Sequence, residues 1–298
     1  MSASSPTSAA PIEAAQVRRA RFAGRPDLWG LLLLTPALLL LIGLFAIPAV
    51  FSVLGALTGK AGGLSLEHFR TAITLYGRDI VFTAWLVCLS VAVIALLAIL
   101  IAGYLILGGN RLAVRALAWL YRWPLFVPMI CAAQMMRSFL AKNGMLNNAL
   151  VASGALSPAG TTSLLDWRGI LITFVWKQLP FVTLLLAGAM AALDRSMIEA
   201  ARDLGAGRLR VLFGIVLPLV RAPLLVGCVL TFVTLMSVLS VPVMLTADSP
   251  TMITVDMAYR INTFGDYGTA DALGVISYLM TMLAAWVYLR QAARERGP

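Results

Sequence analysis

Residues 194–218 have the sequence DRSMIEAARDLGAGRLRVLFGIVLP and lie between two long apolar segments. Ser196 can cap a helix here, with Glu199 three positions later as its reciprocal partner. Small and apolar side chains then recur at helical spacing and form one shallow face: Met197, Ala200, Ala201 and Leu204. Gly205 and Gly207 are expected to end the helix. The sequence therefore predicts a short amphipathic helix that suits docking into a partner's groove, or lying on lipid.

The composition of the whole chain points to a bilayer as its solvent. Of the 298 residues, 60% are hydrophobic and 12% are charged, and the mean hydropathy is +0.90. Soluble domains are about 45–50% apolar and about 25% charged. This difference excludes an ordinary water-soluble enzyme, a disordered chain and a small disulfide-stapled secreted domain.

Six segments are apolar enough and long enough to cross a membrane, since a spanning helix needs roughly 20 such residues. They are residues 29–55, 79–107, 114–140, 168–192, 212–245 and 270–289. The fifth is overlong and contains three prolines, so we expect a short segment that turns into a kinked span. The apolar run 28–57 is too long for a signal peptide and is predicted to be a retained first span. Residues 1–27 are predicted to be a flexible basic arm, and 291–298 a cytoplasmic tail.

Charge distribution predicts the orientation of this all-α membrane protein. Six spans place both ends on one side, and with that side inside, the inner segments have more Lys and Arg than the outer loops. Positive residues gather on the cytoplasmic side, so we expect cytoplasmic N- and C-termini. The net charge of +10 is then explained by topology, and the expected surroundings are a lipid bilayer, with no nucleic-acid partner.

The residue types that support catalysis or metal binding are scarce. The sequence has no phosphate loop of the form G-x-x-x-x-G-K-[ST], so we expect no ATP hydrolysis by this chain through that machinery. Its single histidine, His68, is expected in a solvated loop, and three cysteines without a C-x-x-C spacing predict buried thiols. We therefore predict no catalytic residues, no bound metal and no bound cofactor.

Polar side chains inside the predicted spans are candidates for a solute pathway, because they are costly in a membrane. The line of four in the fifth span, at i, i+3, i+6 and i+9, is expected to follow one helix face. Each of these residues can instead bind a backbone carbonyl or a neighbouring helix. The candidates are Gln134, Lys177, Gln178, Thr231, Thr234, Ser237, Ser240 and Tyr278. The predicted outer loop 247–271 has four Asp and one Arg, and such a face could attract a cationic solute or a basic partner.

The segment 199–218 resembles a known family. It fills every defined position of the pattern E-A-A-x3-G-x9-I-x-L-P, which is typical of the EAA loop in permease subunits of binding-protein-dependent ABC importers. Residues 143–147 and 176–181 are further similarities, and the resemblance extends over about residues 78–290. It implies the type I importer permease fold, with the EAA loop at 194–218.

The resemblance also implies how such a chain works. In this family the EAA helix is a coupling helix that sits in a cleft of a cytoplasmic ATPase subunit, which binds ATP and Mg²⁺. Carried over, Glu199 is the charged anchor, Ala200 and Ala201 give a close-fitting surface, and Gly205 makes the turn. The remaining motif positions are Ile215, Leu217 and Pro218. The implied partners are two ATPase subunits, a second permease (a heterodimer favoured over a homodimer) and an extracytoplasmic binding protein, in a bacterial or archaeal cytoplasmic membrane.

Two features of the sequence favour different substrates. The run Asp203-Leu-Gly-Ala206 after the EAA residues looks like that of polyamine-type permeases, which we favour. The run Trp176-Lys-Gln-Leu-Pro-Phe181 is similar to sugar permeases, so a sugar or polyol remains the alternative. An ion-gradient-driven carrier is a rival of another class, but it usually needs a carboxylate within the membrane.

Overall fold

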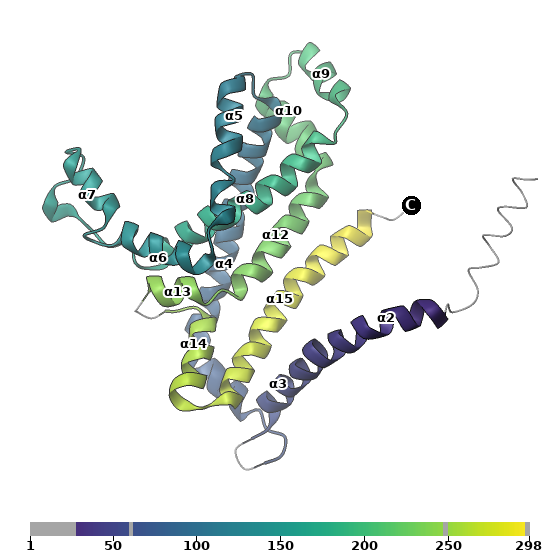
Figure 1. The fold of residues 1–298 in the computed structure, drawn as a ribbon, viewed down its shortest axis with the longest axis vertical. Helices are drawn as coiled ribbons and strands as arrows, with labels where there is room; N and C mark the ends of the chain where they lie inside the picture. The colour runs from purple at the N-terminus through teal and green to yellow at the C-terminus, as the bar shows by residue number, and fades with distance from the viewer. Residues whose placement is uncertain (1–27, 60–61, 247–249, 296–298) are drawn as a thin grey trace, which may run out of the picture. The chain divides into compact units, whose positions relative to one another are not determined.

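The computed structural model describes residues 28–59, 62–246 and 250–295, and within them the chain forms helices joined by short loops (Figure 1). One isolated antiparallel bridge joins Thr58 and Leu64. The chain divides into an N-terminal unit, Met1–Phe51, and a main unit, Ser52–Pro298. The all-α prediction is confirmed. The predicted arm 1–27 lies outside the described residues.

The N-terminal unit contains α2 (Leu28–Leu41), η1 (Ile42–Ala46) and the start of α3 (Ile47–Leu57). Here η1 is a π-helical turn, in which the Ile47 N–H binds the Ile42 carbonyl. Pro48 follows directly. Because proline has no N–H and its ring clashes with the carbonyl four residues earlier, a widened turn gives the ring room without ending the helix.

The main unit is built around α4 (Glu67–Leu107). This helix packs against α8 (Trp167–Ala191), α12 (Arg221–Met236) and α15 (Tyr267–Glu295), as Figure 1 shows. The central core includes the fully buried side chains of Leu86, Ile94, Phe174 and Leu235. A second cluster lies toward the α4 C-terminus, where a Cβ on Gly103 would meet the Leu212 side chain at 2.7 Å. Small residues on α4 therefore allow the close approach of its neighbours.

Four helices are long and apolar enough to cross a membrane: Leu34–Leu57, Glu67–Leu107, Trp167–Ala191 and Tyr267–Trp286. Two bent pairs pass the same test together, so the number rises to six if each pair is one span. The helix that contains the predicted second span begins at Glu67, twelve residues before 79. With 41 residues, this helix is about 60 Å long, twice the thickness of the hydrocarbon core. Part of α4 must therefore project from a bilayer.

The predicted helical span 114–140 is wrong as a single helix. The structure has α5 (Arg111–Leu120), the 3-10 turn η2 (Trp123–Phe126) and α6 (Met129–Leu140), and the pair Arg111–Phe126 and Met129–Ala152 is bent by 108°. Pro124 and Pro128 explain the break. Each removes a helical N–H and crowds the carbonyl four residues earlier.

The predicted kink in the fifth span is confirmed, but residues 212–245 are not one helix. The chain forms α10 (Arg208–Val211), the π turn η4 (Leu212–Val216) and α11 (Leu217–Leu219), then bends by 76° into α12. The π turn again precedes a proline, Pro218, and the bend at Val220 lies three residues before Pro223. The α13 helix (Ser240–Leu245) is separate from α12.

Between α6 and α8 the chain forms α7 (Met145–Ala152) and a short 3-10 turn, η3 (Pro158–Gly160). Asn147 is buried, and its Nδ2 donates to the carbonyls of Ala141 (3.1 Å), Lys142 (3.0 Å) and Thr162 (2.8 Å). A Cβ on Gly144 would meet three backbone oxygens within 2.8 Å. These contacts explain the Asn143-Gly-Met-Leu-Asn147 sequence, because the loop closes around the Asn147 amide.

The opposite end of the main unit from α9 (Arg195–Asp203) holds α14 (Ile253–Tyr259) and the π turn η5 (Arg260–Phe264). Here the prediction for His68 is wrong. His68 is buried in the first turn of α4, with its Nδ1 3.2 Å from Thr269 Oγ1, and packs against Gly268. The histidine closes the contact between α4 and α15.

Candidate functional site

The predicted amphipathic helix is α9, but its cap differs from the prediction. Asp194 and not Ser196 is the N-cap, because the Asp194 carboxylate accepts the Ser196 N–H at 2.9 Å. This hydrogen bond lowers the pKa of the Asp194 carboxyl below its usual value. A carboxylate at this position also interacts favourably with the helix dipole. The helix therefore starts one residue after Asp194, and Glu199 is free of a capping role.

The end of α9 agrees with the prediction. Gly205 has φ +82°, the left-handed conformation in which a side chain is strained. The Gly205 N–H binds the Arg202 carbonyl at 2.8 Å, and the Ala206 N–H binds the Ala201 carbonyl at 3.0 Å. This pair of bonds is the Schellman motif. Gly205 thus reverses the chain toward α10 in a single turn.

The predicted apolar face of α9 divides between two directions. Ile198 is buried, and Ala201 packs with it against a cluster that includes Met190 and Val211. The other three members point outward: Met197 and Ala200 are exposed, and Leu204 is 90% exposed. The single-face prediction is therefore wrong for Ala201. What α9 presents is a narrow strip of Met197, Ala200 and Leu204, which we call the outer strip.

Arg202 fixes α9 to the end of α4, and sequence reasoning missed it. Its Nη2 donates to the carbonyl of Leu107, the last residue of α4, at 3.2 Å. The last carbonyls of a helix lack partners within the helix, and a cation is favourable there. The signal available in the sequence was a basic residue in the last turn of α9. This hydrogen bond therefore ties the helix that presents the outer strip to the end of α4.

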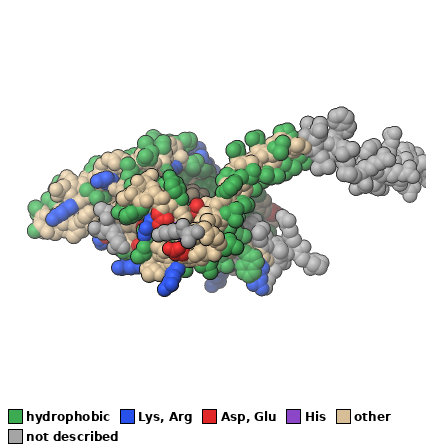
Figure 2. Space-filling model, turned by 90° about the horizontal axis from the view of Figure 1, so that it is seen from below, with side chains coloured by type: hydrophobic (Ala, Val, Ile, Leu, Met, Phe, Trp, Pro, Cys, Tyr) green, Lys and Arg blue, Asp and Glu red, His purple; other side chains and the backbone are tan. Residues whose placement is uncertain are grey.

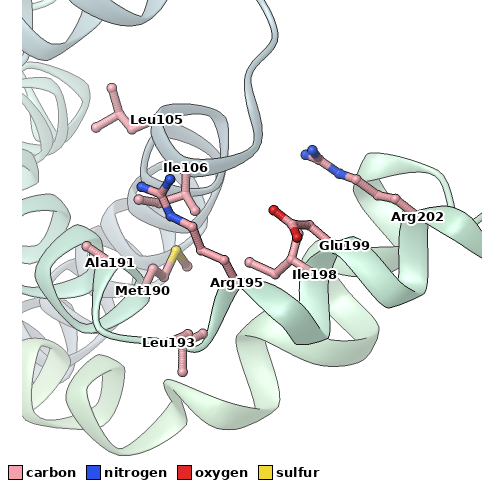
Figure 3. Close-up of a pocket in the computed structure, with 9 residues that line it drawn as sticks. All are labelled: Leu105, Ile106, Met190, Ala191, Leu193, Arg195, Ile198, Glu199 and Arg202. Carbon is pink, nitrogen blue, oxygen red and sulfur yellow. The ribbon is translucent and has the colours of Figure 1, made fainter.

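A cavity of about 240 Å³ lies between α9 and the ends of α4 and α8. Figure 3 shows Arg195, Glu199 and Arg202 projecting from α9 toward this space, which Leu105 and Ile106 line from the other side. Glu199 is exposed and lies between two arginines along the helix. It is accessible and forms no ion pair among the described residues, so its carboxylate is available to a partner's cationic group.

The remaining EAA positions lie in the bent segment before α12. Ile215 is in the π turn η4 and is half-buried, Leu217 packs against the same cluster as Ile198, and Pro218 is exposed. These residues position the segment that follows α9. They do not join the outer strip.

The pathway candidates do not form one group. Gln134 lines a largely apolar cavity of about 710 Å³ together with Met135, Phe139, Met145 and Trp176. Gln178 is half-buried on α8, and Tyr278 is exposed on α15. The prediction that four Ser and Thr share one helix face is wrong, because α12 ends at Met236. Ser237 is then the C-cap of α12, and Ser240 begins α13.

Two of those four hydroxyls bind their own backbone. Thr234 donates to the Leu230 carbonyl, and Ser237 to the Thr234 carbonyl, both at 2.8 Å. Thr231 is buried, and its hydroxyl has no hydrogen-bond partner among the described residues. Thr231 is therefore the member of this line with unused hydrogen-bonding capacity.

The Lys177 side chain binds two backbone carbonyls at the break between α5 and α6. Its Nζ donates to the Pro124 carbonyl at 2.8 Å and the Leu125 carbonyl at 3.3 Å. Residue 128 is a proline and has no N–H for the Pro124 carbonyl four residues earlier, which otherwise accepts the Val127 N–H at 3.3 Å. In a membrane, carbonyls freed by a broken helix need other donors. Lys177 supplies one.

We expect Lys177→Met to lower the free energy of unfolding by about 1–3 kcal/mol, since the Pro124 and Leu125 carbonyls lose a charged donor. Thermal unfolding of the purified chain in detergent measures this effect. Lys142→Met is the matched control, because the Lys142 side chain is exposed. An unchanged unfolding temperature for Lys177→Met, with altered uptake, would instead indicate direct solute contact.

The acidic residues of the predicted outer loop are largely engaged within the main unit. Asp256 is buried, Asp266 lies 3.4 Å from Arg260 Nη1, and Asp271 accepts a hydrogen bond from Ser52. Asp248 lies outside the described residues. Figure 2 views the molecule from this end and shows a small group of acidic side chains near basic ones. The loop therefore gives less support to attraction of a cationic solute than its sequence predicted.

A protein-family profile described as "binding-protein-dependent transport system inner membrane component" matches residues 125–297, more than half of the chain. The match includes α9 and the whole EAA pattern. The chain belongs to this family. The resemblance stated from residues 199–218 is thereby confirmed.

Individual relatives agree with the family. The chain is 31% identical to the sulfoquinovosyl glycerol transport system permease protein SmoG of Agrobacterium fabrum, over 42% of each chain. It is 32% identical to the spermidine/putrescine transport system permease protein PotB of Haemophilus influenzae, over 52% of this chain and 54% of that protein. The chain thus spans about half the length of the curated relatives it matches.

The fold is that of an ABC importer permease. A bacterial alginate ABC transporter, solved in complex with an alginate pentasaccharide-bound periplasmic protein, contains a chain that superposes with a TM-score of 0.75. The match covers 90% of this chain and 95% of that one, at 19% identity. At that identity the likeness establishes the fold alone.

Proposed function

We propose that this chain is a permease subunit of an ATP-driven importer and forms half of a translocation pathway. The observation that carries the proposal is α9, an exposed helix that contacts the ends of α4 and α8 through Arg202 and Ile198. Its outer strip is shallow and apolar, with Glu199 beside it. Such a face suits insertion into a groove on another protein.

The proposed partner at α9 is a cytoplasmic ATPase subunit that binds ATP and Mg²⁺. Closure of two such subunits would move two α9 helices, one in each permease. Because Arg202 bonds α9 to the α4 C-terminus, a displacement of α9 would be transmitted to the longest helix of the main unit. The second permease is proposed to be a different chain, and the solute to arrive on an extracytoplasmic binding protein.

The proposed orientation places α9 and both termini in the cytoplasm of a bacterial or archaeal cell. The distribution of Lys and Arg supports it, since these residues gather on the cytoplasmic side of membrane proteins. The α14 end of the main unit would then face outward. Family membership favours this importer over the carrier driven by an ion gradient.

The proposed substrate class is polyamine-type, with a sugar or polyol as the alternative. The Asp203-Leu-Gly-Ala206 run supports the first. The two relatives named above transport different solutes, a sugar derivative and polyamines, at nearly equal identity. Direct binding measurements on the associated binding protein would decide between the two classes.

Purification of the tagged chain from its native membranes in mild detergent tests the proposed function. We expect an ATP-binding subunit and a second permease to accompany it in fixed ratio. Recovery of the chain alone, under conditions that keep another ABC importer of the same cells intact, would contradict the proposal.

A further inference from the structure

Two buried carboxyl groups meet at one threonine at the α14 end of the main unit. Asp79 on α4 accepts the Thr251 N–H at 2.9 Å, and Asp256 on α14 accepts the Thr251 hydroxyl at 3.0 Å. Only 8% of Asp79 and 7% of Asp256 is exposed. The same threonine thus brings two acids from distant parts of the chain together, away from solvent.

One oxygen of this pair has no partner. Asp256 Oδ2 is buried without a hydrogen bond, and in the described part of the chain no Lys, Arg or His forms an ion pair with Asp79 or Asp256. Arg260 is occupied elsewhere: its Nε donates to the Tyr76 hydroxyl at 2.6 Å, and its Nη1 lies 3.4 Å from Asp266. Buried charges are normally paired, bound to a cation or neutralised.

The surroundings favour a proton over a metal ion. A hard cation such as Ca²⁺ takes six to eight oxygen ligands, whereas the described residues contain no group of three or more His, Cys, Asp or Glu that could hold a metal. A proton needs only one carboxyl oxygen, and Asp256 Oδ2 is available.

We propose that Asp256 is a proton-binding site that controls how tightly the segment 250–256 is held on α4. With Asp256 neutral, the segment keeps its bonds to Asp79 and to Thr83, whose Oγ1 accepts the Ile253 N–H at 2.9 Å. Loss of the proton places two negative charges side by side in a buried site. Their repulsion opposes the same bonds and loosens the segment.

Other titratable groups lie in the elements around this pair. They are His68 and Tyr76 on α4, Arg260 in η5, and Asp266 and Asp271 at the start of α15. Burial, and then the charge of Asp79, raises the pKa of Asp256 from 3.8 to about 7. A carboxyl whose pKa is higher in the folded state binds more protons there, so the stability it confers falls as pH rises from about 4 to 7.

Thermal unfolding of the full chain in detergent, from pH 5 to pH 8.5, tests the proposal. We expect the unfolding temperature of the wild type to fall by about 3 °C or more as pH rises from 5 to about 7, and to change little above that range. Asp256→Asn should remove this component and unfold at a higher temperature than the wild type at pH 8. Glu67→Gln, a change at an exposed acid on α4, is the control and should retain it.

Two further measurements keep the proposal falsifiable if Asp256→Asn does not fold. Asp79→Asn removes the neighbouring charge and should move the midpoint of the change in unfolding temperature to lower pH. The unfolding temperature measured at pH 8 in the presence of Na⁺, K⁺ or Ca²⁺ distinguishes proton binding from metal binding. The proposal would be overturned if Asp256→Asn kept the wild-type pH dependence, or if the midpoint did not move in Asp79→Asn. It would also be overturned by a stabilisation specific to one cation that Asp256→Asn abolishes. None of these readouts depends on transport.

Discussion

Replacing Glu199 with arginine is expected to abolish ATP-dependent uptake and leave the fold intact. Glu199 is exposed and forms no ion pair among the described residues, so the fold does not depend on its charge. Like charges three and four residues apart on a helix cost only about 0.2–0.5 kcal/mol each. At the surface proposed to meet the ATPase, however, the change gives α9 three neighbouring arginines. We therefore expect loss of the ATPase from the purified complex and loss of uptake.

The control for this experiment is Glu67→Arg, the same charge change at an exposed position near the other end of the main unit. It should unfold at nearly the wild-type temperature, retain the ATPase and support uptake. Gly205→Asp is a second variant of α9, and the φ of +82° makes any side chain there strained. Wild-type uptake by Glu199→Arg would show that Glu199 does not anchor the partner.

Replacing Asn147 with aspartate is expected to be the most destabilising single change in the segment between α6 and α8. The Asn147 amide donates to three carbonyls that come from two sides of the loop. A carboxylate has nearly the same shape but cannot donate, so it would face three oxygens in a buried site. Each buried group left without a partner costs about 1–3 kcal/mol. We expect a total of about 3 kcal/mol or more, measured as a lower unfolding temperature in detergent.

The adjacent residue provides a matched control. Asn148 is exposed, and its Nδ2 makes one hydrogen bond, to the Asn143 carbonyl at 3.2 Å. Asn148→Asp makes the same chemical change and should cost less than about 1 kcal/mol. Equal unfolding temperatures for the two variants would mean that the Asn147 amide does not hold the loop.

The sequence predicted best those features that depend on neighbouring residues. The α9 helix, its end at Gly205 and the kink near Pro218 follow from helical spacing, glycine and proline, which act within one or two turns. The cap was misplaced by two residues because both Asp194 and Ser196 can accept a helical N–H. The direction of Ala201 could not be predicted, because it depends on Met190 and Val211 packing beneath α9.

The predictions that failed depended on contacts distant in the sequence. Hydropathy alone made residues 114–140 one continuous helix, although Pro124 and Pro128 break it. The carbonyls freed there are met by Lys177, more than 50 residues away. His68 was placed in a loop because α4 is unusually long, and nothing near residue 68 reveals that Thr269 and Gly268 cover it.

The most direct test of the coupling role is photocross-linking from a single position on the outer strip. A photoreactive amino acid at Leu204, which is 90% exposed, should cross-link the chain to an ATP-binding subunit in native membranes. The same probe at Leu64, 86% exposed and before α4, is the control and should not label that subunit. A cross-link from Leu204 to lipid alone, with the complex intact, would contradict docking of α9 into an ATPase.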